Sequence, residues 1–356
     1  MKSAMRDVLT RLLDAPGPSG FETDAAAVWR EETESFAERT WTDVYGNTFA
    51  SIGEGASPTV MMAGHIDEIG LMVHHVDDDG YLWVKSVGGW DPQVLVGQRV
   101  ELLTRNGPVV GVIGRRAIHL IERDDRDKAV KMKELWLDVG AESAEEAREM
   151  VDLGDTAVIR SDTIHLENGR FAARSIDDRI GAVTVLEALR RAEQKGADCH
   201  AVSVATTQEE IGYKSGGGAS TSTFGLDPDA AVVVDVTHAT DHPSVDQTEH
   251  GDVELGDGPV LTRGAVVNPV MLERMREAAE AAGIDVQYLA EPASSGTDAD
   301  SIYTSRAGVA TAIVSIPDRY MHSPNQMVSE DDVEAGAELI SEFLVRLDAD
   351  TEFIPR

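Results

Sequence analysis

Apolar residues recur every three or four positions in several stretches of the chain, which is the spacing of an amphipathic helix. Residues 3–14 carry Met, Val and Leu at this spacing, and a loop rich in proline and glycine follows. Further helices are predicted over residues 23–37, 178–195, 269–282 and 330–347. Short apolar or alternating stretches predict strands over residues 40–45, 48–52, 59–63, 200–206, 230–236, 286–290 and 307–316. Helices alternating with strands predict an α/β fold whose mixed sheet is flanked by helices on both faces.

The pattern of apolar and polar residues changes between residues 69 and 165. Six short alternating segments stand there, punctuated by Gly, Pro and Asn: LMVHHV, YLWVKSV, QRVELLT, VVGVIG, KELWLDVG and DTAVIR. Helical spacing returns only briefly, over residues 143–150. This pattern predicts a small β-barrel or β-sandwich. We therefore expect a β-rich domain over residues 69–165, inserted into an α/β domain that residues 1–68 and 166–356 form together.

The charge balance narrows the range of partners. The 356 residues include 31 Lys and Arg against 64 Asp and Glu, a formal net charge of −33. Nucleic acids and anionic membranes are excluded as main partners, because binding phosphate requires a basic surface. Only seven of the basic residues are Lys, and the acids are spread along the whole chain. That composition favours adaptation to high salt, where screening removes the self-repulsion, over an ordinary acidic protein.

The cysteine count, the apolar runs and the first residues of the chain bear on its cellular compartment. Cys199 is the single cysteine, so an internal disulfide is impossible. The longest apolar runs fall far short of the roughly 18 residues that span a bilayer. The first residues contain scattered charges and no apolar signal region. We expect a cytoplasmic protein.

Five segments carry side chains of the kind that bind metal ions, and most of them follow apolar strands. In an α/β sheet, polar residues beyond the carboxyl ends of the strands converge even when they are far apart in sequence. The candidates are His65 and Asp67, Asp177 and Asp178, Glu209 and Glu210, Asp235, and His322. Histidine and carboxylate ligands suit Zn²⁺ or a similar divalent ion. So many carboxylates exceed the needs of one tetrahedral ion, which favours two ions that share a carboxylate.

Each segment also has a plainer interpretation. Two adjacent glutamates are usually a solvated acidic pair, and either Asp177 or Asp178 suits the cap of a helix. The local spacing nevertheless fits a metal site. Residues 65 and 67 point the same way in an extended chain, so Asp67 is able to hold the ring of His65. Adjacent glutamates point apart, which leaves one free to act as a base while the other binds metal.

Six segments together resemble one known family. They are AGHIDEIGLMV, AARSIDDRIGA, TTQEEIGYKSGG, VVVDVTHATDHP, SSGTDAD and RYMHSPNQMVSEDD, in this order and across nearly the whole chain. The chain is similar to the M42 metallo-aminopeptidases, the family that includes the tetrahedral (TET) aminopeptidases and the glutamyl aminopeptidases. The chain has Ser294 and Ser295 where the family often has a glycine, a minor departure.

The resemblance implies two metal ions, zinc or cobalt first, with manganese also tolerated. It assigns His65 and Asp235 to one ion, Glu210 and His322 to the other, and Asp177 as the bridge. No ligand position departs from the family pattern.

It also implies that Glu209 is the general base, which activates a water between the two ions, and that Asp67 orients His65. Gly296 and Thr297 would lie near the substrate. The reaction implied is removal of the N-terminal residue from short peptides. Spacing alone leaves a second reaction open, because a related metal-dependent deacylase would use the same centre on N-acyl amino acids or peptides. The resemblance further implies homo-oligomers formed through the inserted domain, with a tetrahedral dodecamer as one such assembly.

Overall fold

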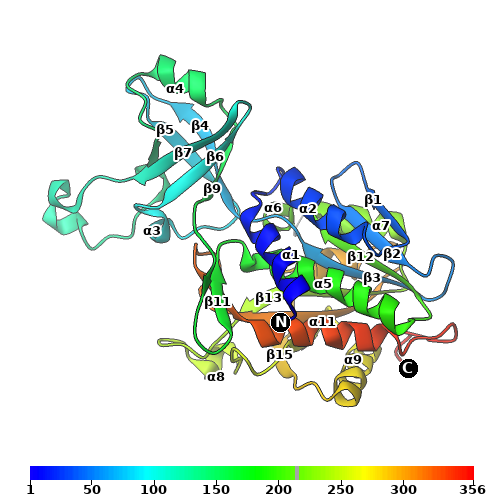
Figure 1. Cartoon of the computed structure of the whole chain (residues 1–356). Helices are drawn as coiled ribbons and strands as arrows, with labels where there is room; N and C mark the ends of the chain where they lie inside the picture. The colour runs from blue at the N-terminus through cyan, green and yellow to red at the C-terminus, as the bar shows by residue number, and fades with distance from the viewer. Residues whose placement is uncertain (213–215) are drawn as a thin grey trace.

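The computed structural model describes residues 1–212 and 216–356; residues 213–215, within one of the quoted segments, lie outside the description. The chain forms a large α/β unit and a smaller barrel that projects from it (Figure 1). Between the two, the chain crosses once after residue 65 and returns after residue 159. The mixed sheet flanked by helices and the small β-rich unit are both confirmed. The boundaries of the inserted domain, residues 69 and 165, stay a prediction.

An eight-stranded sheet forms the centre of the α/β unit, in the order β1-β2-β12-β3-β13-β16-β14-β15. Its strands are β1 (Arg39–Thr42), β2 (Thr48–Ile52), β3 (Thr59–His65), β12 (His200–Thr206), β13 (Ala230–His238), β14 (Val260–Gly264), β15 (Gln287–Glu291) and β16 (Ala310–Asp318). The four central strands β12, β3, β13 and β16 are parallel, whereas β2 and β14 pair antiparallel with them. The parallel strands end at one edge, and this edge carries the candidate ligands.

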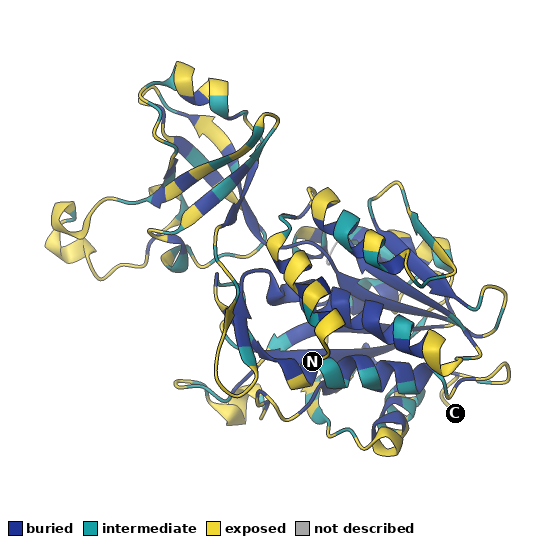
Figure 2. Ribbon diagram, viewed as in Figure 1, coloured by how far each residue is buried: buried dark blue, intermediate teal, exposed yellow. Residues whose placement is uncertain are grey.

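Helices cover both faces of this sheet, as the sequence predicts. One face packs against α1 (Ser3–Asp14), α2 (Thr23–Thr33), α5 (Ile176–Lys195), α9 (Pro269–Ala282) and α11 (Glu330–Leu344). The other packs against α7 (Gly217–Leu226) and α10 (Ala299–Ile302). Figure 2 shows the central strands between them as mostly buried ribbon, whereas the edge strands β1 and β15 are partly exposed. The predicted helix at residues 23–37 ends earlier, because residues 34–36 turn before β1, and the C-terminal helix ends three residues short of residue 347.

The smaller unit is a closed barrel rather than a sandwich, with the order β4-β5-β8-β7-β6-β9. Its strands are β4 (Gly70–Val76), β5 (Leu82–Val87), β6 (Arg99–Thr104), β7 (Gly107–Gly114), β8 (Trp136–Asp138) and β9 (Thr156–Ile159). Alternate side chains such as Leu71, Val84 and Leu102 fill its own core. The short helices α3 (Pro92–Leu95) and α4 (Ala144–Met150) lie against it.

An arm of residues 115–135 leaves the barrel between β7 and β8 (Figure 1). It contains three single-turn 3₁₀ helices, η1 (Ile118–Leu120), η2 (Arg123–Asp125) and η3 (Met132–Glu134). Figure 2 shows most of it as exposed.

A three-stranded sheet that the sequence does not predict lies beside the large one. It consists of β10 (Ile164–His165), β11 (Arg170–Ala173) and β17 (Gln326–Ser329) in sequential order. It pairs the segment that follows the barrel with the segment that follows His322. Two short helices, α6 (Glu209–Gly212) and α8 (Gln247–His250), complete the described elements. No described helix is long and apolar enough to cross a membrane.

Candidate metal centre

The structure brings all of the predicted ligand side chains to one edge of the sheet. His65 is the last residue of β3, Asp235 lies near the end of β13, and Glu209 and Glu210 open α6 directly after β12. Asp177 lies at the start of α5, and His322 lies in the loop after β16. Convergence at the carboxyl edge of parallel strands is the reason that residues so far apart in sequence meet here.

Two groups of three ligands share one carboxylate. His65, Asp177 and Asp235 form the first group, and Asp177, Glu210 and His322 form the second, with the ligand atoms of each group within 4.8 Å of one another. Nε2 of His65 lies 3.0 Å from Oδ1 of Asp177, and Nε2 of His322 lies 3.3 Å from its Oδ2. The two oxygens of Asp177 therefore face different histidines, which is the arrangement expected of a bridging carboxylate.

Glu209 stands beside these groups and belongs to neither. Its Oε2 lies 3.9 Å from Nε2 of His65. Its Oε1 is buried and has no hydrogen-bond partner among the described residues. The carboxylate therefore lies next to the ligands with one oxygen uncommitted, as a group that accepts a proton in catalysis requires.

Close packing of α5 against β3 sets the position of Asp177. A Cβ on Gly64 would lie 2.4 Å from the backbone of Gly181, so a glycine is needed where helix and strand meet. Asp177 and Asp178, joined by a cis peptide bond, then make different contacts. The carboxylate of Asp178 accepts hydrogen bonds from the backbone N–H of Gly181 (2.9 Å) and of His65 (3.0 Å). Asp178 thus caps the helix and leaves Asp177 free to face the histidines.

Asp67 is completely buried. It contacts its predicted partner His65 and further groups of the site as well. Nδ1 of His65 lies 3.4 Å from its Oδ1 and 3.2 Å from its backbone oxygen. Its carboxylate also accepts hydrogen bonds from the backbone N–H groups of Glu209 (3.1 Å) and Glu210 (3.2 Å), and from the hydroxyl of Ser19. One side chain therefore ties β3 to the start of α6.

A contact from the barrel was not predicted. Nδ1 of His322 lies 2.6 Å from the backbone oxygen of Gly89, in the loop after β5. A ring nitrogen bonded to a carbonyl carries the proton, so Nε2 is the nitrogen that faces Asp177 and Glu210. No side-chain motif marks this contact, because the acceptor is a backbone atom. Gln326 was not predicted either, because its side-chain oxygen accepts a hydrogen bond from a backbone group, the N–H of Asp177, at 2.6 Å.

The electrostatics of the cluster follow from burying several carboxylates together. Burial raises the pKa of Asp235 and of Glu210 to about 8, reinforced by the charge of Asp177. Burial likewise raises the pKa of Glu209 well above its ordinary value. Burial also acts to raise the pKa of Asp177, but hydrogen bonds from His322 and His65 hold it below its usual range. These carboxylates would therefore ionise more readily if positive charge were bound between them.

The residues fit divalent cations. Oε1 of Glu210, like that of Glu209, is buried without a hydrogen-bond partner among the described residues, a costly state unless a cation or water satisfies it. The donors are imidazole nitrogens and carboxylate oxygens, the non-thiolate ligands of zinc and its neighbours. Two cations would be held by the two groups of ligands, with Asp177 common to both.

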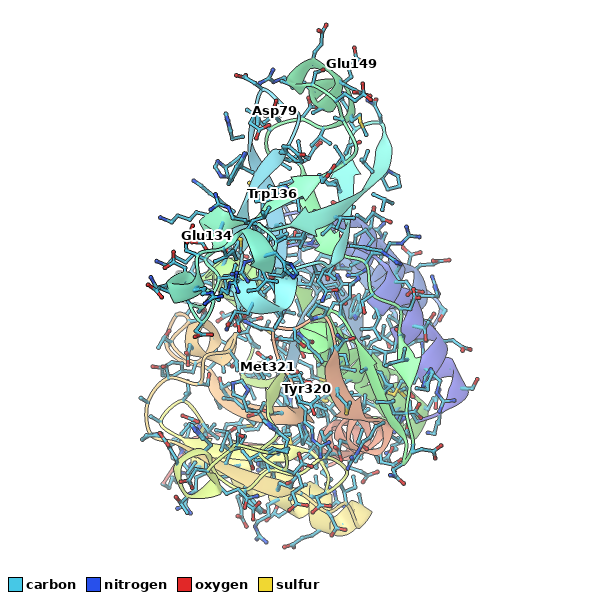
Figure 3. All side chains as sticks on the ribbon, turned by 90° about the vertical axis from the view of Figure 1, so that its left-hand side faces the viewer. Asp79, Glu134, Trp136, Glu149, Tyr320 and Met321 are labelled. Carbon is cyan, nitrogen blue, oxygen red and sulfur yellow. The ribbon has the colours of Figure 1, made fainter. Side chains whose placement is uncertain are left out.

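A cavity of about 350 Å³ adjoins the centre. Asp177, Glu209, Glu210, Asp235 and His322 line one side of it. The segment 295–297 lines another side, so the predicted substrate residues Gly296 and Thr297 do face the same space as the ligands. Met321 also borders the cavity, and Figure 3 shows it with Tyr320 near the middle of the molecule, below the barrel.

Comparison with known proteins shows the family of this chain. Residues 46–339 match the model of the M42 glutamyl aminopeptidase family. The chain belongs to the M42 family. A lysyl aminopeptidase of Pyrococcus furiosus is 35% identical over 96% of this chain and 97% of its own. The crystal structure of a TET aminopeptidase from a marine sediment thaumarchaeon superposes with a TM-score of 0.91, at 35% identity over 97% of both chains.

A third relative, the TET1 peptidase of Pyrococcus horikoshii, superposes with a TM-score of 0.85 at 30% identity. The match covers 96% of this chain and all of that one, and that peptidase assembles into a tetrahedron or a large octahedral shell. Membership of the M42 family makes this chain a metal-dependent aminopeptidase, a hydrolase of peptide bonds. The deacylase alternative is not favoured, because these relatives match over nearly their whole lengths and are named as aminopeptidases or peptidases.

Proposed function

We propose that this M42 enzyme removes N-terminal residues from short peptides with two divalent cations and Glu209 as the general base. The observation that carries the proposal is the pair of ligand groups that share Asp177, with the uncommitted carboxylate of Glu209 beside them. His65 and Asp235 complete one group, and Glu210 and His322 the other. Zinc or cobalt would suit these ligands best, and manganese is compatible with them.

When bound, the cations would lower the pKa of an attacking water and polarise the scissile carbonyl. Glu209 accepts a proton from that water as its oxygen bonds to the carbonyl carbon. The same carboxyl then delivers the proton to the leaving nitrogen as the C–N bond breaks. Asp67 acts as a positioning residue, since it holds the backbone of Glu209 and Glu210 and lies against the ring of His65.

Gly296 and Thr297 are proposed to contact the substrate. Gly296 is exposed in a left-handed conformation (φ 74°) that favours glycine, and Thr297 is buried beside it. A cavity of about 350 Å³ holds one residue side chain and the adjoining peptide bond, which supports removal of residues one at a time.

We propose that copies of the chain associate through the barrel, in a tetrahedral dodecamer. The assembly of the Pyrococcus horikoshii relative supports this, and so does the barrel's position away from the catalytic sheet (Figure 1). A hollow shell of this kind would admit short peptides and exclude folded proteins. Light scattering of the purified protein should give about twelve times the 38.3 kDa of one chain. We further place the enzyme in the cytoplasm of a salt-adapted cell, on its single cysteine and its net charge of −33.

The test uses aminoacyl-p-nitroanilides beside their N-acetylated counterparts, in high salt with Zn²⁺ or Co²⁺ added. Hydrolysis of the free-amine substrates only, abolished by a chelator and restored by the cation, is the expected result. Hydrolysis of the blocked substrates, or none by protein shown to contain metal, would overturn the proposal.

A further inference from the structure

Beyond the metal centre, the cavity has a wall built from the sheet. Thr262 of β14, Leu289 of β15, and Ile313 and Ser315 of β16 line it. Thr262 pairs with Leu289, and Ile313 and Ser315 are two residues apart in one strand, so these side chains share one face of the sheet. None of these four side chains is charged.

Glu291, the last residue of β15, stands at the end of this wall. It is two residues beyond Leu289, so strand alternation turns its side chain to the same face, and it lines the same cavity. The side chain is half-buried. Its carboxylate has no hydrogen bond or ion pair among the described residues, and no described Lys or Arg lines the cavity. Glu291 is therefore a carboxylate without a structural partner, aimed at the substrate space.

With two divalent cations bound, Glu291 would differ from the other carboxylates of the cavity, because its charge would not be offset. The four carboxylates at the centre, Asp177, Glu209, Glu210 and Asp235, carry four negative charges when ionised, and two divalent cations would offset all four. Glu291 is the fifth carboxylate of the cavity and remains unbalanced. His238 also borders the cavity, but burial lowers its pKa, so its imidazole adds no positive charge near neutral pH.

We propose that Glu291 selects peptides whose first residue carries a cationic side chain, lysine or arginine. This inference rests on the aminopeptidase function proposed above and names its substrate class. The apolar stem of such a side chain packs on Leu289 and Ile313, and its charged end pairs with Glu291. An acidic first residue is disfavoured, because it brings a like charge against Glu291. The carboxylate acts as a specificity residue and takes no part in bond cleavage.

The experiment compares lysyl-, norleucyl- and glutamyl-p-nitroanilide on the metal-loaded enzyme. Norleucine has the stem of lysine without its ammonium, so the lysine-to-norleucine ratio of kcat/KM isolates the charge. We expect a ratio of about ten or more, the effect of a hydrogen bond to a charged group, with the glutamyl substrate poorest. In Glu291→Gln the ratio should fall to about one through a rise in KM for lysine alone. In Glu291→Lys the glutamyl substrate should become better than the lysyl one.

The matched control is Glu277→Gln, which removes the same charge from the exposed side of α9 and should keep the wild-type ratio. A wild-type ratio near one, or a ratio that survives Glu291→Gln, overturns the assignment of Glu291 while leaving the aminopeptidase function intact. If metal-loaded wild-type enzyme hydrolyses none of the three substrates, both proposals fail.

Discussion

At the scale of single residues, neighbours with the same side chain have different surroundings. Asp177 faces two histidines, whereas Asp178 holds the backbone of His65 and the first turn of α5. Glu210 joins a ligand group, whereas Glu209 belongs to neither group. Chemistry in this centre therefore depends on where the backbone directs each carboxylate, and single substitutions should separate metal binding from proton transfer.

Replacing the proposed base should stop turnover without emptying the site. Glu209→Gln keeps the shape of the side chain but cannot accept a proton, so kcat should fall by about 10²- to 10⁴-fold. The metal content per subunit should stay at the wild-type value, because Glu209 belongs to neither ligand group. Steady-state kinetics with elemental analysis of the same samples measures both. Turnover like that of the wild type would show that another group takes the proton.

Glu22 makes stability depend on pH. Burial and the nearby Asp67 raise its pKa from 4.5 to about 7 in the folded protein. The folded state therefore holds this proton more tightly than the unfolded chain, so the contribution of Glu22 to stability is greatest below about pH 4.5 and is lost as the pH rises through 7. Glu22→Gln should remove this loss, which is on the order of 3 kcal/mol above pH 7.

Urea unfolding of wild-type and Glu22→Gln protein from about pH 5 to about pH 8 measures this difference. The gap between the two free energies of unfolding should widen as the pH rises. The control is Glu31→Gln at an exposed position on α2, whose gap from the wild type should stay constant. A constant gap for Glu22→Gln as well would contradict the prediction.

At the scale of elements, the loop after β5 links the barrel to the metal centre. A Cβ on Gly89 would lie 3.1 Å from Nδ1 of His322, and one on Gly88 would lie 3.4 Å from Oε2 of Glu210. Glu210 and His322 belong only to the second ligand group, and each therefore has a glycine of this loop packed against it. The position of the barrel and the geometry of the proposed second cation site are therefore expected to be coupled through this loop.

Crowding Gly89 should weaken one cation site and spare the other. Gly89→Ala displaces the ring of His322 or the carbonyl it bonds, and loss of such a partner costs about 10- to 100-fold in metal affinity. Titration with Zn²⁺ or Co²⁺ should then resolve one tight site and one weakened site per subunit.

Gly225→Ala is the control for the Gly89 substitution. It adds the same methyl group within α7, where nothing lies within 4 Å of the new Cβ. It should bind both cations as the wild type does. Two equally tight sites in Gly89→Ala would show that the loop plays no part in holding His322.

At the scale of the whole molecule, the dominant feature is the net charge of −33. Repulsion between dispersed acids opposes the compact state, and salt weakens it by shortening the Debye length from about 10 Å at 0.1 M to about 3 Å at 1 M. The folded protein should therefore gain stability over that range. Thermal unfolding in KCl, with cations saturating, should show a midpoint that rises steadily with salt. A midpoint independent of KCl would contradict salt adaptation.

Much of the fold was predictable because its signals are local. The spacing of Met5, Val8 and Leu12 predicts α1 with its observed ends, and all six predicted β segments between residues 69 and 165 enter the barrel. By contrast, α7 was not predicted, because its Gly, Ser and Thr residues form no apolar stripe. The strand β10 was missed because it has two exposed residues and exists only through its pairing with β11.

The sequence by itself determined which residue types stand at the ends of the strands, and with them the candidate ligands from His65 to His322. Periodicity and residue chemistry are properties of neighbours in the chain, so they can be read without coordinates. Only the tertiary structure decided that Asp177 faces both histidines, that the carbonyl of Gly89 holds His322, and that Glu291 looks into the cavity. These facts depend on strand order and on the approach of the barrel, which long-range pairing settles and no local pattern encodes.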